Sequence, residues 1–228
     1  MKFFLPFCCF VMLSSIVGAQ KPEELAQAMH DKRVRLPNGW HLSPAGSSLP
    51  LGDLPLNLAL SRSQKWLAVT NNGQSVQSIQ LINTRQEKVV DNVVIAKSWY
   101  GLKFSADEKF LYASGGNDNR ILQYAINNDK LILQDSIVLG KPWPVKISPA
   151  GIEIDDAAQL MYVVTKENNV LYIINMTTKS ILQQIPLDKE AYTCLLSPDK
   201  KNCTSPCGAA IKCWYSTPGK ERSPPKLP

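Results

Sequence analysis

The sequence predicts an all-β fold built from a repeated unit. The clearest copy runs from Leu102 to Asn127, where a short alternating strand ends in a Ser-Ala-Asp-Glu-Lys turn. A second strand at Phe110 to Ser114 and a third through Tyr124 follow, joined by a hairpin rich in glycine and asparagine. Strands that alternate apolar and polar residues between such turns are typical of an antiparallel β-meander.

Four copies of this unit align on their turn residues, Ser61, Ser105, Asp155 and Ser197, which lie 44, 50 and 42 residues apart. A four-stranded propeller blade takes about 40 to 50 residues, so the spacing fits one blade per copy. The long middle interval contains an additional segment rich in proline and glycine, Gly140 to Gly151. The sequence therefore predicts an incomplete β-propeller with about three four-stranded blades.

The repeat also predicts where each blade begins and ends. We expect blades at residues 55–97, 98–144 and 145–189, and the first strand of a further blade at residues 190–201. Residues 36–54 are predicted to form an outer strand, because Leu49 to Gly52 resembles the segments that end two outer strands, Ile137 to Gly140 and Ile185 to Asp188. In a closed propeller such a strand completes the last blade, which leaves no strand edge unpaired.

The N-terminal residues have the pattern of a secretory signal. Lys2 precedes an apolar run from Phe3 to Val17, and the small residues Gly18 and Ala19 suit signal peptidase. The run is too short for a transmembrane helix, so we predict a signal peptide at residues 1–19 and an exported protein, periplasmic or extracellular, with no membrane span. Residues 20–35 would form a lead-in segment before the blades.

The charge distribution argues against a nucleic-acid partner. The formal charge of +6 includes +1 from Lys2 and +3 from residues 202–228, so residues 20–201 carry +2. These residues contain no basic stripe, and a mixed solvated surface explains their charge.

The chain changes character after Lys201. Strand alternation stops, and Cys203, Cys207 and Cys213 follow with the spacing C-x3-C-x5-C, which matches no zinc motif. A disulfide or metal segment is one interpretation. A frameshift is the other, because a reading frame shifted by one base permits KLYISLWGGDKVLVF, which aligns without a gap onto the strand and hairpin after Ser105. We therefore predict an out-of-frame, disordered tail at residues 202–228.

Several segments together resemble a known group of propellers. LPLGDLPLNLALS, SWYGLKFSADEKFLYASGGNDN and GKPWPVKISPAGIEIDD resemble YncE-like, YVTN-type propellers, and the resemblance covers residues 36–201. More narrowly, they resemble the N-terminal propeller of exported bacterial proteins that carry a phosphoesterase domain of the alkaline phosphatase superfamily. The resemblance implies a seven-bladed ring, of which this chain supplies about three blades, followed by a catalytic domain.

No catalytic, cofactor-binding or metal-binding residue is predicted. Alkaline-phosphatase-type hydrolysis needs Asp and His metal ligands, and the two histidines, His30 and His41, precede the blades. Asp155 and Asp156 could suggest a metal or acid–base pair, but they occupy the turn position of Ser61 and are better explained as turn residues.

Four residues are candidates for ligand contacts at the mouth of the central channel: Trp99, Tyr100, Trp143 and Lys146. They qualify because the loops before the inner strands face that channel, while packing between blades is the alternative role for the aromatic rings.

The sequence supports two functional hypotheses. The preferred one is a non-catalytic propeller that binds a small ligand or a protein at its face, or acts as a scaffold beside a phosphoesterase. The alternative is a lactonase-like propeller enzyme acting on a small ligand at the central channel. Because three blades would leave apolar faces uncovered, we also expect the chain to be marginally stable, prone to aggregation, or dependent on self-association of the open ring.

Overall fold

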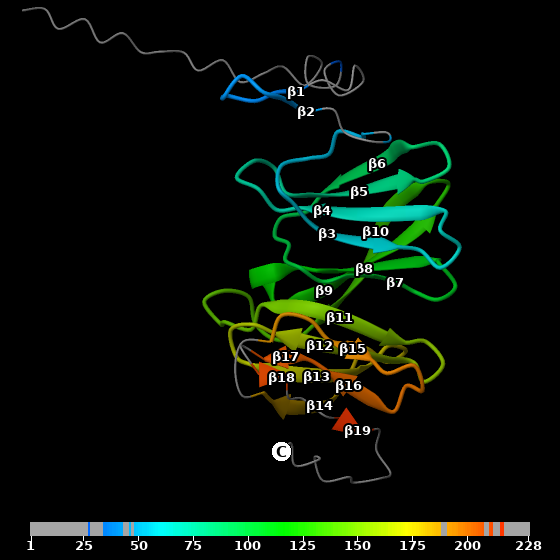
Figure 1. Ribbon diagram of the computed structural model, residues 1–228. Helices are drawn as coiled ribbons and strands as arrows, with labels where there is room; N and C mark the ends of the chain where they lie inside the picture. Colours follow the sequence, from blue (N-terminus) through cyan, green and yellow to red (C-terminus); the bar gives the residue numbers. More distant parts are fainter. Residues whose placement is uncertain are drawn as a thin grey trace, which may run out of the picture. The chain divides into compact units, whose positions relative to one another are not determined.

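A computed structural model of the chain describes residues 27, 34–42, 46, 48–187, 191–207, 210–211 and 215–216. The chain divides into two compact units, residues 1–50 and 51–228, and the described parts are almost entirely strands and turns (Figure 1). The predicted all-β class is confirmed. The predicted signal peptide lies outside the described residues, as does most of the lead-in segment.

The first unit contains one short hairpin. Strand β1 (Val34–Arg35) pairs with β2 (His41–Leu42) in antiparallel register. The turn between them has Gly39 at φ +85°, a conformation that favours glycine. The outer strand predicted at residues 36–54 stays a prediction: His41–Leu42 pairs with β1, and the described residues from Ser48 to Asp53 form no strand. The predicted partner was a ring-closing last blade, which is not among the described residues.

The second unit contains three four-stranded antiparallel sheets, each paired in simple sequence order. The strands of the first sheet are β3 (Pro55–Leu60), β4 (Trp66–Asn71), β5 (Ser78–Asn83) and β6 (Lys88–Val94). The second has β7 (Leu102–Phe104), β8 (Phe110–Ser114), β9 (Arg120–Asn127) and β10 (Lys130–Val138), with a 3-10 turn, η1 (Gly116–Asp118), between β8 and β9. The third has β11 (Pro149–Asp155), β12 (Leu160–Thr165), β13 (Val170–Asn175) and β14 (Ile181–Pro186). We call these sheets blades 1, 2 and 3.

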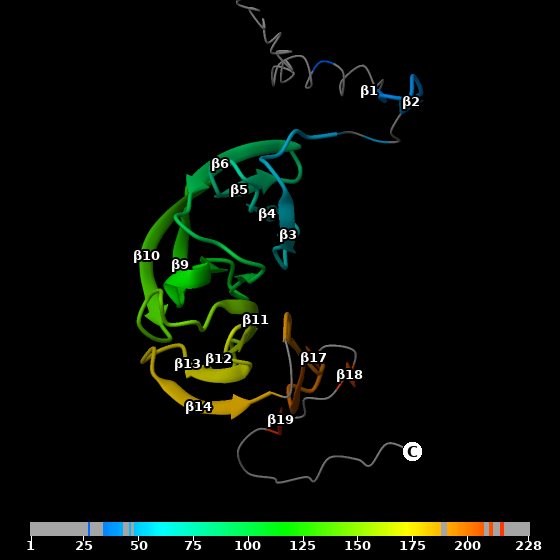
Figure 2. The ribbon, with the colours of Figure 1, turned by 90° about the vertical axis from the view of Figure 1, so that its left-hand side faces the viewer.

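The three blades pack face to face through apolar side chains. One core lies between blades 1 and 2 and includes Ala68, Leu81, Leu111 and Tyr124. A second lies between blades 2 and 3. Figure 2 shows the outer strands β6, β10 and β14 on the convex side of this unit and the inner strands β3 and β11 on its concave side. Each blade is thus buried on the faces that meet another blade, as the alternating pattern predicts.

The turn after each inner strand has a local cause. In blade 2 the Ser105 hydroxyl accepts a hydrogen bond from the Phe110 amide at 3.0 Å and donates one to Asp107 Oδ1 at 2.7 Å. The Glu108 amide donates to the Ser105 carbonyl, and Glu108 has φ +59°. Serine and aspartate at these positions satisfy the backbone of a tight turn, so this five-residue segment determines its own shape.

A further partial sheet follows blade 3. Strand β15 (Leu195–Leu196) pairs with β16 (Asn202–Thr204), which pairs with β19 (Tyr215–Ser216), while β17 (Pro206–Cys207) pairs with β18 (Ala210–Ile211). The expected disorder from Asn202 onward is therefore wrong for Asn202–Thr204. The reason is burial, since Cys203 and Cys194 both pack against blade 3 beside Tyr162 and Val164.

Candidate ligand-binding surface on the inner strands

The inner strands form one continuous wall. Strand β3 lies beside β7, β7 beside β11, and β11 beside β15. Two glycines at the same repeat position allow this approach: a Cβ on Gly101 would lie 2.4 Å from the carbonyl oxygen of Ala150, and one on Gly151 would lie 2.5 Å from the Cα of Thr193. Both contacts are shorter than real Cβ atoms permit, so a larger residue at either position would push neighbouring inner strands apart.

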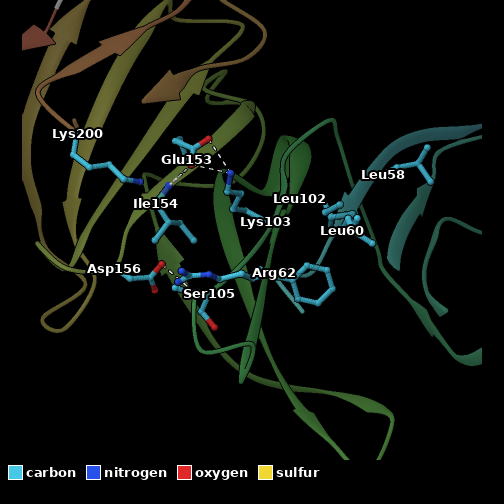
Figure 3. A pocket seen from close by; sticks show the side chains of 13 residues that line it. Leu58, Leu60, Arg62, Leu102, Lys103, Ser105, Glu153, Ile154, Asp156 and Lys200 are labelled. Carbon is cyan, nitrogen blue, oxygen red and sulfur yellow. Dashed lines mark hydrogen bonds and ion pairs between the residues drawn. The ribbon is translucent and has the colours of Figure 1, made fainter. Parts of the chain in front are cut away.

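A cavity of about 440 Å³ opens where these strands run into their turns (Figure 3). Its apolar lining includes Leu102 and Ile154, and its charged lining comes from the inner strands or turns of all four sheets. The charged residues are Arg62, Lys103, Glu153, Asp156 and Lys200. Three cationic and two anionic side chains therefore share one hollow.

The centre of this hollow is an ion pair between two blades. Lys103 Nζ lies 2.8 Å from Glu153 Oε1 and 2.9 Å from Oε2, so the ammonium contacts both carboxylate oxygens. The Ile154 amide also donates to Oε1 at 3.2 Å. Glu153 is buried whereas the Lys103 side chain is 39% exposed. A buried carboxylate needs a partner because desolvation is costly, so this pair holds β7 and β11 together and leaves Glu153 no free oxygen.

The remaining charges lie at the turns. In Figure 3 the Arg62 side chain extends toward Ser105 and Asp156, and the Lys200 side chain extends toward Ile154. Neither the Arg62 guanidinium nor the Lys200 ammonium has a hydrogen-bond or ion-pair partner among the described residues. Asp156 Oδ2 accepts a hydrogen bond from the Ala106 amide at 3.0 Å. The hollow therefore offers two unpaired cationic groups, which suit an anionic group of a ligand.

The same environment perturbs a tyrosine in the core beside the hollow. Burial, followed by the negative charges of Asp156 and Asp107, raises the pKa of Tyr112 to about 12. Tyr112 therefore remains neutral over the physiological range and contributes packing rather than charge.

Two of the predicted mouth residues come together with a third aromatic residue. The ring centroids of Trp99 and Tyr192 lie 6.0 Å apart, and those of Tyr100 and Tyr192 lie 5.8 Å apart. The Asn57 side chain fixes this loop by donating to the Tyr100 carbonyl at 2.7 Å. Lys166 Nζ lies 5.2 Å from the Trp99 ring centroid, within the range of a cation–π interaction. The Trp99 indole N–H is buried and has no acceptor among the described residues.

The other two predicted mouth residues form a separate pair. Lys146 Nζ lies 5.4 Å from the Trp143 ring centroid, and both side chains are exposed. Among the described residues, no ring contact joins Trp143 to Trp99 or Tyr100. Their loop is held by Asn119, whose amide group donates to the carbonyls of residues 141 and 145 at 2.6 and 2.7 Å. The structure thus divides the four candidates into two pairs.

Sequence reasoning missed Lys103, Glu153 and Tyr192. A signal for the first two was present, because each is a charged residue between two apolar residues of an inner strand, two residues before Ser105 and Asp155 respectively. Opposite charges at one repeat position in neighbouring blades indicate an ion pair across the blade interface. Tyr192 follows residues 188–190, which are not described, and carries no comparable signal in the sequence.

The described residues contain neither a metal-binding cluster nor a membrane-spanning helix. No group of three or more His, Cys, Asp or Glu side chains in this part of the chain is placed to hold a metal ion. No helix within it is long and apolar enough to cross a membrane.

Comparison with known proteins shows the fold. The sequence matches no family model and no curated protein. Several solved structures do match. Hydrazine synthase of Kuenenia stuttgartiensis matches at 18% identity with a TM-score of 0.58, and the match covers 73% of this chain and 46% of that chain. The Dos1 propeller matches at 14% identity and a TM-score of 0.57, covering 78% of this chain and 43% of that chain. The fold is an incomplete β-propeller.

A third match has the same character. The WD40 repeats of RRP9 match at 11% identity and a TM-score of 0.55, covering 69% of this chain and 46% of that chain. This chain spans about half the length of the solved chains that it matches. WD40 repeats are propeller blades, so this match supports the same fold.

Proposed function

We propose that this chain is an exported, non-catalytic β-propeller module that binds a small ligand or a protein segment at the concave face of its inner strands. The observation that carries the proposal is the hollow lined by all four inner strands or their turns, with the unpaired cations Arg62 and Lys200 at its rim. These groups suit a ligand with a carboxylate or phosphate group. The aromatic cluster of Trp99, Tyr100 and Tyr192 and the Trp143–Lys146 pair do not line the hollow, and would provide separate contacts where the inner strands begin.

The carboxylates near the hollow support binding over catalysis. Both oxygens of Glu153 contact Lys103, Asp156 accepts a hydrogen bond from the Ala106 amide, and Asp155 accepts one from the Ala158 amide. A lactonase-like site would need a carboxylate or a metal ion free to activate water. The acids present here instead hold the turns and the blade interface.

The narrower identity is also part of the proposal. The resemblance of residues 36–201 to YncE-like, YVTN-type propellers supports a place in a seven-bladed ring that precedes a phosphoesterase domain in longer relatives. The shifted-frame reading supports a frameshift after Lys200 or Lys201. Sequencing the nucleotides across codons 195 to 240 tests this directly. One inserted or deleted base that restores KLYISLWGGDKVLVF would support it, and an uninterrupted frame ending at Pro228 would contradict it.

Binding is tested by isothermal titration calorimetry, in which the full chain is titrated with inorganic phosphate and, separately, with small dicarboxylates. We expect Arg62→Glu and Lys200→Glu each to weaken binding by about tenfold, because each replaces a ligand-facing cation with an anion. Lys88→Glu is the matched control, since Lys88 is exposed on the outer strand β6 and does not line the hollow. Equal weakening by all three variants would show only a general charge effect and would contradict the site.

Catalysis is tested separately by measuring lactone hydrolysis by the full chain with and without added divalent metal. Turnover that is lost in Glu153→Gln or Asp156→Asn would contradict the non-catalytic proposal and favour the lactonase-like alternative. Absence of turnover in a sample that binds phosphate would support the binding module.

A further inference from the structure

The first blade exposes the face that the other blades bury. Leu58 and Leu60 of β3 occupy the repeat positions of Leu102 and Phe104 of β7. Leu58 and Leu60 are 59% and 54% exposed, whereas Leu102 and Phe104 are 5% and 7% exposed because blade 1 covers them. The third-blade residues at these positions, Ile152 and Ile154, are buried as well.

The opposite end of the second unit exposes the complementary position. Leu195 of β15 occupies the repeat position of Ala59, and that position lies on the side of each inner strand that faces the following blade. Ala59 packs into the core that contains Leu102 and Phe104. Leu195 is 60% exposed. In blade 1 this side of the inner strand is covered by blade 2. In the partial sheet of β15 and β16 the corresponding side, which carries Leu195, is uncovered.

These two exposed faces have the chemistry to cover each other. Between blades 1 and 2, Ala59 lies in the same core as Leu102 and Phe104, the side chains of the next blade at the Leu58 and Leu60 positions. Between blades 2 and 3 the Ala59 position is occupied by Lys103, which pairs with Glu153 instead. Leu195 and the Leu58–Leu60 pair are the two halves of a contact like the one between blades 1 and 2, at the two ends of one unit. A contiguous exposed apolar patch on a soluble protein often marks a surface that binds a partner. The same repeat contact could therefore form between chains.

We propose that two copies of this chain bind each other through these faces, so that Leu195 of each copy packs on Leu58 and Leu60 of the other and the two copies close a ring. Each interface joins two different surfaces, one from each copy. Such head-to-tail contacts form a closed ring only when the rotations between successive copies add up to a full turn, and otherwise they form an open filament. The matched solved structures support a ring of two, because this chain covers between 43% and 52% of their length.

The test is the mass of the full chain in solution, measured by light scattering after size-exclusion chromatography over a hundredfold concentration range. We expect twice the monomer mass. L58K and L195E should each raise the dissociation constant by more than about tenfold, because each places a charge in an apolar contact. Leu58 and Leu195 are exposed within one copy, so both variants should keep the wild-type circular dichroism spectrum.

A mixture of the two variants distinguishes two explanations for the loss of the dimer: disruption of a specific contact between the two end faces, and a general loss of exposed apolar surface. In a mixed ring, one interface has both wild-type faces and the other joins two introduced charges of opposite sign. The equimolar mixture should therefore recover the dimer, although neither variant forms it alone. L182K is the matched control, because Leu182 is 57% exposed on the outer strand β14 and lies on neither end face. It should leave the dimer intact.

Several results would overturn the proposal. A monomeric wild-type chain at every concentration would do so, and so would polymers of indefinite size, which would show that the contact does not close. A dimer that survives both L58K and L195E would place the interface elsewhere. Failure of the mixed variants to recover the dimer would show that the two end faces do not meet.

Discussion

The β7–β8 hairpin of blade 2 and the β15–β16 hairpin begin with the same turn and continue differently. The Ser197 hydroxyl accepts from the Asn202 amide at 3.0 Å and donates to Asp199 at 2.6 Å, which repeats the geometry around Ser105. After the turn, blade 2 continues with the apolar strand Phe110–Ser114, whereas the other hairpin continues with Asn202–Thr204. The turn therefore depends on local residues, and the length of the strand depends on the apolar side chains that follow.

The largest expected change in the free energy of unfolding comes from the position at which the two hairpins bury side chains of different volume. Leu111 and Cys203 occupy the same position, six residues after Ser105 and Ser197, and both are buried. Leu111→Ala should lower the free energy of unfolding by about 2 to 5 kcal/mol because it leaves a cavity between blades 1 and 2. Cys203→Ala removes much less volume and should cost about 1 kcal/mol. Urea denaturation of the two variants measures both values.

Equal losses from these two substitutions would contradict the comparison. They would show that the partial sheet packs on blade 3 as extensively as β8 packs on blade 1.

The next effect concerns the charged position that β7 and β11 have and β15 lacks. Glu153→Gln removes the partner of Lys103, which is partly exposed, so the free energy of unfolding should fall by about 1 to 2 kcal/mol rather than by the larger cost of a fully buried pair. Asp129→Asn is the control, because the pair of Asp129 with Lys65 is long, at 4.0 Å, and exposed. It should change stability by less than about 0.5 kcal/mol. If Glu153→Gln and Asp129→Asn changed the free energy of unfolding equally, the buried ion pair of Glu153 would contribute no more to stability than the exposed pair of Asp129.

The two turns provide a smaller and more direct test of local determination. Ser105→Ala and Ser197→Ala each remove one hydroxyl that accepts from an amide and donates to an aspartate. Each should lower the free energy of unfolding by about 1 kcal/mol, and by similar amounts. Thermal unfolding by circular dichroism would measure the pair. A loss confined to Ser105→Ala would show that the Ser197 turn does not contribute to the cooperative unit.

The smallest effect under ordinary conditions concerns Tyr112, whose position is occupied by Thr204 in the other hairpin. Its pKa rises from 10.0 to about 12 on folding, chiefly through burial. The unfolded chain therefore loses this proton first as pH rises, and stability that is fully present below pH 10 should fall as pH approaches about 12. Denaturation midpoints across this range should fall less steeply in Tyr112→Phe. Identical slopes in both proteins would contradict the raised pKa.

Several features were predictable because their causes are local. The alternation in Phe110–Ser114 and the repeated turn residues determine strands and hairpins over a few residues, and the strand order follows because neighbouring segments pair. The frameshift interpretation illustrates the limit of this reasoning. It led to an expectation of disorder at Asn202, whereas pairing with β15 and burial of Cys203 against blade 3 produce a strand there.

The candidate site was predicted only in part. Trp99 and Tyr100 were selected because they precede an inner strand, and the structure places Tyr192 beside them. Trp143 and Lys146 met the same criterion but stack on each other in a separate loop. Proximity in the repeat does not determine which loops touch, because loop length and internal hydrogen bonds such as those of Asn119 place each loop individually.

By itself, the sequence determined the all-β class, the blade repeat and the turns, because each depends on periodicity and hydrogen bonds within about ten residues. Only the tertiary structure decided that Lys103 meets Glu153, that Arg62 and Lys200 share one hollow, and that Leu58 and Leu195 end the unit as exposed apolar faces. These features join residues from different blades. Their contacts depend on how whole sheets pack, which no short segment of the chain specifies.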